Sequence, residues 1–447
     1  MTDRTVMSPA EALMWAVERD PILRSTFLNI TILDRAPDLD RLRGRMQDAI
    51  ASFPRLRRRV RTAAAPWDRP RWIDDASFDI AFHVRRVALP PPGSHRQLLD
   101  LSALMLEDAF DPVRPLWQVT VVEGLEGGRA ALLAKMHHTI TDGVGGIRLS
   151  SSFLDLDREG QVPVRAAAPE RPAEPNEPAT GRSPLQTAAG LAGALRPQAV
   201  LRQTLESVEL ARSLARQGAV VGGRGSPLWT ERSMGRRLYT IDLDLDLVRR
   251  AAKGLGGTIN DLFVTGVAGG AAAYHGREGV PVREFRVSVP VSTRADASFG
   301  GNSFAPARVV VPADPDARPA ERFRAVHQVL NRARGEKALG VADSLAAVLL
   351  ALPPALLTPV ARQQVSTVDF ATSNLRGSPV ELFVGGAAVL ANYPMGPTAG
   401  VAFNATVLSY LDRLDLGLDV DAAAVADAEM LRGCIESSFA ELFAAGA

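Results

Sequence analysis

A proline-rich segment near the middle of the chain divides it into two halves of similar size. Between Val162 and Pro184, prolines recur among alanines and charged residues, a composition that buries too little apolar surface to fold alone. We therefore expect an extended linker there, followed by a helix over 185–217, where apolar residues recur at helical spacing. The predicted organisation is an N-terminal lobe over residues 1–161, a linker and helix over 162–225, and a C-terminal lobe over 226–447.

Both halves alternate between strand and helix patterns. In the first half, Ser8–Asp20 predicts a helix with Ser8 as its N-cap, and the runs Trp117–Glu123 and Ala130–Met136 predict a hairpin. In the second half, Thr258–Tyr274 predicts a helix rich in small residues, and Phe285–Val291 predicts a strand. The predicted fold class is therefore α/β, with mixed sheets in two lobes joined by a long crossover linker.

Composition argues against several classes of function. Lysine and arginine number 51 and aspartate and glutamate 50, so the net charge is only +1, whereas bulk nucleic-acid binding requires a basic excess. The single cysteine, Cys434, excludes an internal disulfide and a multi-cysteine metal site. The sequence lacks an uninterrupted apolar run of about 18 residues and an apolar signal-peptide core near its start. We therefore expect a cytoplasmic protein that is not integral to a membrane.

Two adjacent histidines, His137 and His138, mark the segment with the clearest chemical pattern. They follow an apolar strand pattern, and Asp142 and Gly143 come at fixed offsets after them. Histidine takes a proton from a hydroxyl near neutral pH, a nearby carboxylate orients a ring or holds a loop, and glycine adopts backbone angles closed to other residues. One alternative is that the two histidines only cap the end of the strand and take no part in chemistry. A zinc site is another, although the spacing lacks a helical ligand pair and no cysteine lies nearby in the sequence.

Short motifs spread over nearly the whole chain carry a family resemblance. The His-His-x3-Asp-Gly pattern is the signature of the coenzyme-A-dependent acyltransferase superfamily. With the other motifs, the chain resembles the bacterial wax ester synthase/diacylglycerol acyltransferase family more narrowly. The matching residues besides His137 to Gly143 are Pro115-Leu116-Trp117, Asn260-Asp261, Arg294 after Val289-Pro290-Val291-Ser292, Ser373-Asn374, and the run from Asn404 to Asp419.

This resemblance implies both a fold and an activity. The implied fold has two chloramphenicol-acetyltransferase-like lobes with an active-site tunnel between them. The implied activity is an O-acyltransferase that moves a fatty acyl group from acyl-coenzyme A (acyl-CoA), its co-substrate, to diacylglycerol and to long-chain alcohols, giving triacylglycerol and wax esters. The transfer is implied to be direct, without an acyl-enzyme, and to need neither a metal nor a permanently bound cofactor.

By the same resemblance, the residues of the histidine motif take distinct roles. His138 is implied to be the general base that takes the proton of the acceptor alcohol. His137 is implied to shape the strand end or to line the tunnel. Asp142 is implied to pair with Arg294, and Gly143 to supply backbone geometry.

The other matched residues are implied to support the site. Asn260 aids the oxyanion or anchors the junction between lobes, with Asp261 beside it at a predicted helix start, where both residue types are also common as caps. Ser373 and Asn374 are placed near the acyl or pantetheine path. Pro115, Leu116 and Trp117 are implied to pack the hairpin or the tunnel wall.

A dense basic run follows Pro54. As a strand, Arg55 to Arg61 places alternate arginines on one face, which is either a solvated face or a surface for anionic lipid or for coenzyme A phosphates. The helix expected over 185–217 is basic with an apolar side, which is typical of a weak interfacial helix. We therefore expect peripheral contact with the inner face of the membrane or with lipid droplets.

Two alternative functions stay open. One is a condensation-type acyltransferase that uses carrier-protein thioesters, although the chain carries the Pro-Leu-Trp and Asn-Asp motifs of the lipid branch. The other is a catalytically silent lipid-droplet or lipid-carrier protein, although such a protein has no chemical need of His138, Asp142 and Gly143. Turnover of acyl-CoA with diacylglycerol separates these functions.

Overall fold

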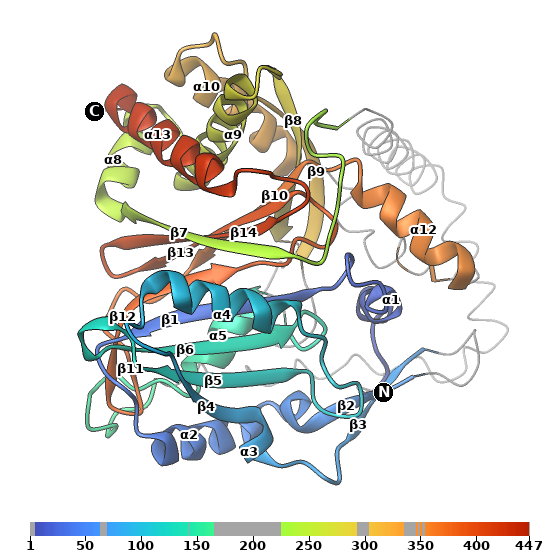
Figure 1. The fold of residues 1–447 in the computed structure, drawn as a ribbon, viewed down its shortest axis with the longest axis vertical. Helices are drawn as coiled ribbons and strands as arrows, with labels where there is room; N and C mark the ends of the chain where they lie inside the picture. The colour runs from blue at the N-terminus through green and yellow to red at the C-terminus, as the bar shows by residue number, and fades with distance from the viewer. Residues whose placement is uncertain are drawn as a thin grey trace, which may run out of the picture.

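The computed structural model describes residues 5–62, 69–141, 143–164, 225–292, 304–334, 346, 349–350 and 354–446. Within these residues the strands form two mixed six-stranded sheets and a two-stranded ribbon, and helices pack on and between the sheets (Figure 1). This confirms the α/β fold with mixed sheets predicted from the sequence. The helix expected over 185–217 and most of the proline-rich linker lie outside the described residues.

The first sheet has the strand order β11-β12-β1-β6-β5-β4. Its strands are β1 (Thr26–Leu33), β4 (Val84–Ala88), β5 (Trp117–Glu123), β6 (Ala130–His137), β11 (Phe383–Val384) and β12 (Ala387–Met395). β5 and β6 form the predicted antiparallel hairpin, with Trp117 opposite Met136. All of β6 is buried, because α2 (Leu39–Ser52) and α4 (His95–Glu107) place apolar side chains on opposite faces of the sheet.

Two strands of the first sheet, β11 and β12, come from the C-terminal half of the chain. β12 runs antiparallel to β1, with Leu28 opposite Met395. The boundary predicted at residue 226 assigns β11 and β12 to the C-terminal lobe. The structure instead places both strands in the first sheet. The physical reason is that β1 is buried along most of its length. Its outer edge therefore needs a partner strand to satisfy backbone groups that water does not reach.

The second sheet has the strand order β7-β14-β13-β10-β8-β9. Its strands are β7 (Arg236–Asp244), β8 (Glu284–Ser292), β9 (Phe304–Pro312), β10 (Phe370–Arg376), β13 (Phe403–Tyr410) and β14 (Arg413–Asp421). β10 runs parallel to both of its neighbours, β8 and β13, and the other pairs are antiparallel. This sheet therefore has parallel pairing at its centre and antiparallel strands at its edges.

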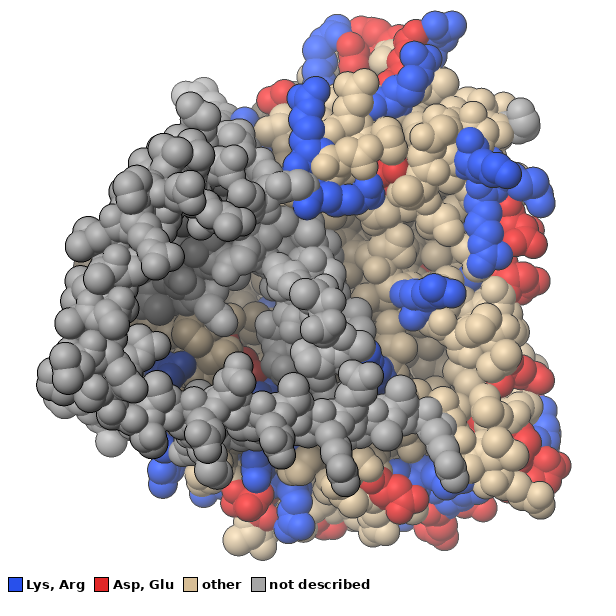
Figure 2. All heavy atoms as spheres, turned by 180° about the vertical axis from the view of Figure 1, so that it is seen from behind, with Lys and Arg blue, Asp and Glu red and all other residues tan. Residues whose placement is uncertain are grey.

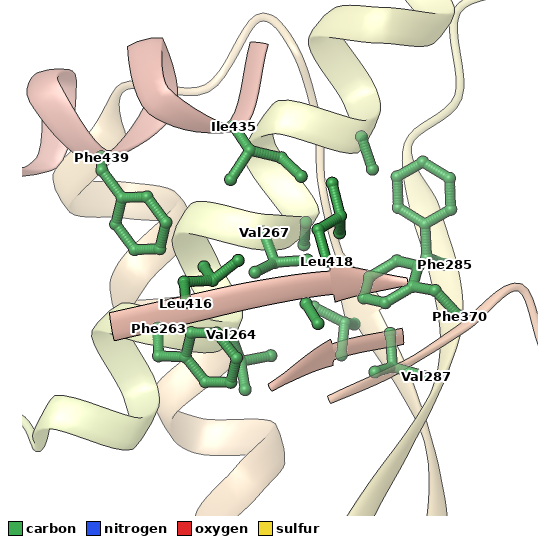
Figure 3. Packing of buried hydrophobic residues seen from close by; sticks show 14 of the residues in the cluster. Phe263, Val264, Val267, Phe285, Val287, Phe370, Leu416, Leu418, Ile435 and Phe439 are labelled. Carbon is green, nitrogen blue, oxygen red and sulfur yellow. The ribbon is translucent and has the colours of Figure 1, made fainter. Parts of the chain in front are cut away.

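Helices α8 (Leu245–Gly254), α9 (Ile259–Arg277), α10 (Pro319–Arg334) and α13 (Ala428–Gly446) pack on the second sheet. Figure 3 shows the core between them, where side chains such as Val267, Leu418 and Ile435 meet. α9 lies very close to α13, since a Cβ atom at Gly270 would lie only 2.4 Å from Cα of Ile435. This close approach explains why the predicted helix is rich in small residues.

The two sheets meet through α4 and β12. The Arg96 guanidinium of α4 donates to the backbone oxygen of Leu238 over 3.0 Å, and Nε2 of His95 lies 3.0 Å from Oγ1 of Thr240, so α4 is tied to β7. β12 approaches β14 so closely that a Cβ atom at Gly417 would lie 2.1 Å from the Pro394 oxygen. Only glycine fits there, and the contact fixes the relative position of the sheets.

The basic run after Pro54 does not form one continuous strand. Pro54–Arg57 is a short 3-10 helix, η1, and only Arg58–Arg61 is a strand, β2, which pairs with β3 (Arg71–Asp74). The prediction of a strand from Arg55 to Arg61 is therefore wrong for residues 55–57. The proline ring fixes φ near the helical value and favours the turn. Arg55 in this turn contacts interior residues, as described below, rather than forming part of a surface row.

Charges of both signs are interspersed on the molecular surface. Figure 2 shows this for the described part of the face that lies behind the view of Figure 1, in keeping with the net charge of +1. Such a surface exerts little long-range attraction on a polyanion. Among the described residues, no helix combines the length and the apolar composition needed to cross a bilayer.

Asp419 of β14 makes the stability of this fold depend on pH. The side chain is buried, and neither carboxylate oxygen has a hydrogen-bond partner among the described residues. Burial raises the pKa of Asp419 to about 7, against about 4 in an unfolded chain. The folded protein therefore binds more protons than the unfolded chain between these values, so its stability is expected to fall as pH rises from about 4 to about 7.

Asp419→Asn is expected to remove this pH dependence. At pH 8 the variant should be more stable than the wild type by a few kcal/mol, because each pKa unit corresponds to about 1.4 kcal/mol. At pH 4 most of the advantage should vanish, since the wild-type carboxyl is then protonated in the folded state and about half protonated in the unfolded chain. Urea unfolding at the two pH values measures the difference. A constant difference between the variant and the wild type across this range would contradict the assignment to Asp419.

Candidate active site

His138 directly follows the end of β6, at the edge of the first sheet. Its backbone N–H donates to the backbone oxygen of Ser25 over 2.9 Å, so the register between β1 and β6 extends to it. Its ring is half-buried and lies 4.9 Å from the ring of Phe27, measured between ring centres. The sheet therefore fixes the backbone of His138 and leaves part of its side chain accessible.

His137, the last residue of β6, is fully buried and engaged at both ring nitrogens. The backbone N–H of Thr139 donates to Nδ1 over 3.1 Å, and the Thr139 hydroxyl lies 2.7 Å from the same nitrogen. Nδ1 is thus the acceptor, and Nε2 carries the hydrogen. Nε2 donates to the carboxylate of Glu18 over 2.8 Å, and Glu18 also accepts from the backbone N–H of Ser25. His137 therefore joins the end of β6 to the start of β1.

Arg55 and Glu11 hold the loop that follows the two histidines. Nη1 of Arg55 lies 2.6 Å from Oε1 of Glu11 and 3.1 Å from the backbone oxygen of Thr139, and donates to both. Glu11 is buried in α1 (Pro9–Val17), where it forms a capping box with Ser8, the N-cap predicted from the sequence. The Arg55 guanidinium also lies 5.3 Å from the centre of the Trp72 ring. One arginine thus connects α1, β3 and the residue next to His138.

The Pro115-Leu116-Trp117 motif packs beneath the same strand end. Trp117 is fully buried, its indole N–H donates to the Leu56 oxygen over 2.7 Å, and its ring stacks on His83 at 4.5 Å between ring centres. The backbone N–H of His137 donates to the Leu116 oxygen over 3.1 Å. The residue just before β5 therefore holds the backbone of His137, and Trp117 packs the motif into the core.

Two asparagines from separate family motifs lie together in the second lobe. Nδ2 of Asn374, on β10, donates to Oδ1 of Asn260, in the first turn of α9, over 3.4 Å. Asn374 is exposed and the neighbouring Ser373 is half-buried. α5 (Gly143–Ser151), the helix that begins at the motif glycine, contacts β10. The histidine motif of the first lobe is thereby brought against the strand that carries Ser373 and Asn374.

Asp261 is a buried junction of hydrogen bonds. Its Oδ2 accepts from Thr258 in the capping box of α9 and from Nδ1 of His327, 2.7 Å away, and its Oδ1 accepts from Arg334 over 3.1 Å. Burial alone would raise the pKa of Asp261, but the hydrogen bonds from His327 and Thr258 and the Arg334 charge outweigh it and hold the pKa below its usual value. These contacts fix α9 against α10 and so position Asn260.

Asp142 and Arg294 lie outside the described residues, so the pairing predicted for them stays a prediction. Cys434 is buried in α13, and burial raises the pKa of its thiol, which makes it a poor nucleophile. Among the described residues, no group of three or more histidine, cysteine, aspartate or glutamate side chains is arranged to hold a metal ion.

Comparison with known proteins identifies the family to which the chain belongs. A family model described as the wax ester synthase/diacylglycerol acyltransferase catalytic domain matches residues 7–263, and one described as the C-terminal domain of the same family matches residues 300–443. The chain belongs to the wax ester synthase/diacylglycerol acyltransferase family. The resemblance drawn from the sequence motifs is thus confirmed.

Curated relatives of this family member include proteins of Mycobacterium tuberculosis assigned as diacylglycerol O-acyltransferases. One is 33% identical over 453 residues, which cover 98% of this chain and 91% of the relative. Another is 30% identical and covers 98% of this chain and 97% of the relative. The protein is therefore an acyltransferase of the wax ester synthase/diacylglycerol acyltransferase type.

Solved structures agree with the two-lobed fold. The wax ester synthase/diacylglycerol acyltransferase from Marinobacter aquaeolei VT8 superposes with a TM-score of 0.68 at 20% identity, covering 99% of this chain and all of that one. The first condensation domain of the calcium-dependent antibiotic synthetase superposes with a TM-score of 0.65 at 16% identity, covering 100% of this chain and 97% of the other. The chloramphenicol-acetyltransferase-like architecture predicted from the motifs is thereby confirmed.

Sequence reasoning missed three residues that hold the histidine motif, namely Glu11, Glu18 and Arg55. A signal for Glu11 was present, because Ser8 and Glu11 have the Ser-x-x-Glu spacing of a capping box. Glu18 and Arg55 lie far from the motif in the sequence and belong to common residue types. The basic run predicts a solvated or anion-binding face for Arg55, whereas the structure connects it to Glu11 and Thr139.

Proposed function

We propose that this protein transfers a fatty acyl group from acyl-CoA to the hydroxyl of diacylglycerol, and to long-chain alcohols as a second class of acceptor. Family membership supports the lipid acceptors, and relatives are named for diacylglycerol acylation. A structural neighbour, the starter condensation domain of rhizomide synthetase, is described in complex with C8-CoA (TM-score 0.63, 14% identity). Because that neighbour has the same fold, its complex supports acyl-CoA as the donor in the proposed reaction.

The observation that carries the proposal is the difference between the two histidines. Both ring nitrogens of His137 are engaged by Thr139 and Glu18 within a buried site. His138 has a backbone fixed by Ser25 and a half-buried ring beside Phe27. A general base must reach the substrate proton, and of these two rings the partly accessible one belongs to His138. His138 is therefore assigned as the base and His137 as a positioning residue.

The proposed reaction balances without a covalent enzyme intermediate. The imidazole of His138 takes the proton of the acceptor hydroxyl as the oxygen attacks the thioester carbonyl. The tetrahedral oxyanion then collapses, the carbon–sulfur bond breaks, and the coenzyme A thiolate takes the proton from His138. A preorganised donor at the oxyanion lowers the barrier. We assign the Asn260–Asn374 pair to the region of the oxyanion, either as its hydrogen-bond donor or as the anchor between the lobes. We assign Asp142 and Arg294 the role of holding the loop of the histidine motif.

The acceptors are nearly insoluble in water, so the enzyme is expected to collect them at a lipid surface. We propose peripheral attachment to a membrane or lipid droplet. Lipid-facing contacts of this kind combine apolar area with local charge. Within the described residues, large apolar side chains such as Leu104, Met234 and Leu356 are exposed, and they offer such contacts without a spanning helix.

An acceptor panel tests the proposed function. The purified protein is incubated with labelled long-chain acyl-CoA and, separately, with diacylglycerol in vesicles, a long-chain alcohol, or an amine presented as a carrier-bound thioester. Labelled triacylglycerol, with some wax ester, is the expected result. Product only with the carrier-bound amine would replace this proposal with the condensation reaction. Absence of labelled product with every acceptor would indicate a catalytically silent carrier protein.

A further inference from the structure

A small polar cavity lies at the junction of the two sheets, outside the residues assigned to the reaction. Its volume is about 20 Å³, which is enough for one occupant of the size of a water molecule. Its lining includes polar residues from β1, α4, β7, β14 and the loop after β12, namely Arg24, Thr26, Glu107, Arg236, Thr398 and Asp419. The cavity is therefore enclosed by elements of both sheets.

Strand register shows that the lining side chains of the two sheets face each other. In the second sheet, Asp419 of β14 lies directly opposite Leu238 of β7, and Arg236 precedes Leu238 by two residues, so the three side chains share a face. Leu238 packs in one apolar cluster with Leu28 of β1, so this face points to the first sheet. Thr26 shares the face of Leu28, two residues on, and so points to the same space as Asp419.

The same lining residues carry buried polar atoms that make no hydrogen bond to any described residue. These atoms are Nε of Arg24, the hydroxyls of Thr26 and Thr398, Nη1 of Arg236 and both carboxylate oxygens of Asp419. The side chains of Thr26, Thr398 and Asp419 are at most 4% exposed. Nη1 of Arg236 lies 4.0 Å from Oδ2 of Asp421, which is beyond hydrogen-bond reach. Each unmatched buried group costs free energy, so five such side chains around one cavity indicate a bound molecule.

The charges around the cavity favour a neutral occupant. A cation would face the guanidinium groups of Arg24 and Arg236, which can only donate hydrogen bonds. An anion would face Asp419, whose pKa is raised mainly by burial and further by the carboxylates of Asp421 and Glu107. Water, in contrast, accepts from a guanidinium and donates to a carboxylate, and it also accepts from a protonated carboxyl group. One water molecule therefore matches the lining in either protonation state of Asp419.

We infer that this cavity binds one water molecule that joins the two sheets. A guanidinium group donates to the water oxygen, and the water donates to the Asp419 carboxylate and to a threonine hydroxyl, within the two to four hydrogen bonds typical of buried water. Such a bridge is enthalpically almost as favourable as a direct hydrogen bond. The water thereby connects β7 and β14 of the second sheet to the start of β1.

The bound water supports the strand end beside the candidate base. Thr26 lies directly opposite His137 on β6, and the backbone oxygen of the preceding residue, Ser25, accepts from the backbone N–H of His138. The backbone next to Thr26 thus holds His138 in place. Thr26 is therefore a positioning residue that acts on turnover through the water and the backbone of β1. This role rests on the proposed function, whereas the water site itself does not.

A crystal structure of the purified protein, from crystals grown with sodium bromide, tests the occupant directly. The inference expects one electron-density peak of the size of a water molecule, within hydrogen-bond distance of Asp419 and Thr26 and without the anomalous signal of bromide. A cavity without density would overturn the inference. An anomalous peak in the cavity would also overturn it, because the site would then bind an anion.

Thermal unfolding of threonine variants tests the water site in solution. Thr120 of β5 is the matched control, because it too is buried with a hydroxyl that has no described partner, but it does not line the cavity. Thr120→Val should therefore leave the unfolding temperature unchanged or raise it. Thr26→Val removes a partner of the water and should lower the unfolding temperature by roughly 2 °C, and Thr26→Ser should restore it. An equal rise in Thr26→Val and Thr120→Val would mean that no water is bound.

Steady-state kinetics with acyl-CoA and diacylglycerol test the positioning role. Thr26→Val should lower kcat by about two- to tenfold with little change in KM, because a displaced base slows the chemical step, and Thr26→Ser should restore kcat. An unchanged kcat in Thr26→Val would overturn the positioning role. Absence of turnover in the wild type would overturn the proposed function alone, and the crystal structure and the unfolding temperatures would then decide the water site.

Discussion

His138→Ala is expected to lower turnover by about 10²–10⁴-fold while leaving the fold intact. The substitution removes the base that takes the acceptor proton. It leaves the backbone bond from His138 to Ser25 in place and removes only a half-buried ring. Initial rates of labelled triacylglycerol formation measure the effect, and thermal unfolding confirms that the variant is folded.

His137→Ala is the matched control for this experiment. The ring of His137 joins Thr139 to Glu18 inside the protein, so its removal should lower the unfolding temperature more than the rate per folded molecule. His138→Ala should show the opposite pattern. Near-wild-type activity in folded His138→Ala would refute the assignment of the base. Equal losses of rate in the two folded variants would mean that the base is misassigned between them.

Arg55→Met is expected to destabilise the protein by roughly 3–5 kcal/mol, because it leaves the buried Glu11 carboxylate without its cationic partner. The same change frees the Thr139 backbone oxygen and so loosens the loop beside His138. Arg55→Lys keeps the charge but loses the planar guanidinium whose Nη1 donates to both acceptors. It is expected to fold and to lower kcat more than it raises KM. Urea unfolding and steady-state kinetics measure the two effects.

A double-mutant cycle that combines Arg55→Met with Glu11→Gln isolates the interaction between Arg55 and Glu11. The double variant should be more stable than the sum of the single changes predicts, because the unpaired buried charge is gone. Arg249→Met, which breaks an exposed ion pair with Asp246, is the control and should cost only about 0–1 kcal/mol. Additive effects in the cycle, or wild-type stability in Arg55→Met, would show that Arg55 does not hold the loop.

The sequence predicted local features of this fold better than its long-range pairing. The hairpin of β5 and β6 follows from alternating apolar residues and a glycine-containing turn, and the start of α1 follows from the cap at Ser8. β12 was not assigned to the first sheet, because its apolar pattern says that it is buried without saying which strand it pairs with. Its place beside β1 depends on residues more than 350 positions away in the sequence.

The same distinction holds for the candidate site. His137 and His138 are recognisable because the motif is contiguous, and Asn260 and Asn374 because each lies in a family motif. Their contact, in contrast, needs β10 and α9 to come together in space. The inward role of Arg55 was hidden by its neighbours. A run of arginines indicates a charged surface, and only the fold shows that one member contacts the buried Glu11.

The most direct test of the central claim is a rapid-quench experiment with acyl-labelled acyl-CoA and vesicles that contain diacylglycerol. The purified wild type is mixed with both substrates, stopped in acid within a single turnover, and separated into protein, lipid and free coenzyme A. Direct transfer predicts that label passes from the thioester to triacylglycerol in step with release of free coenzyme A. No label should remain on the denatured protein, and His138→Ala should form almost no product. Label attached to the protein before triacylglycerol forms would contradict direct transfer by His138.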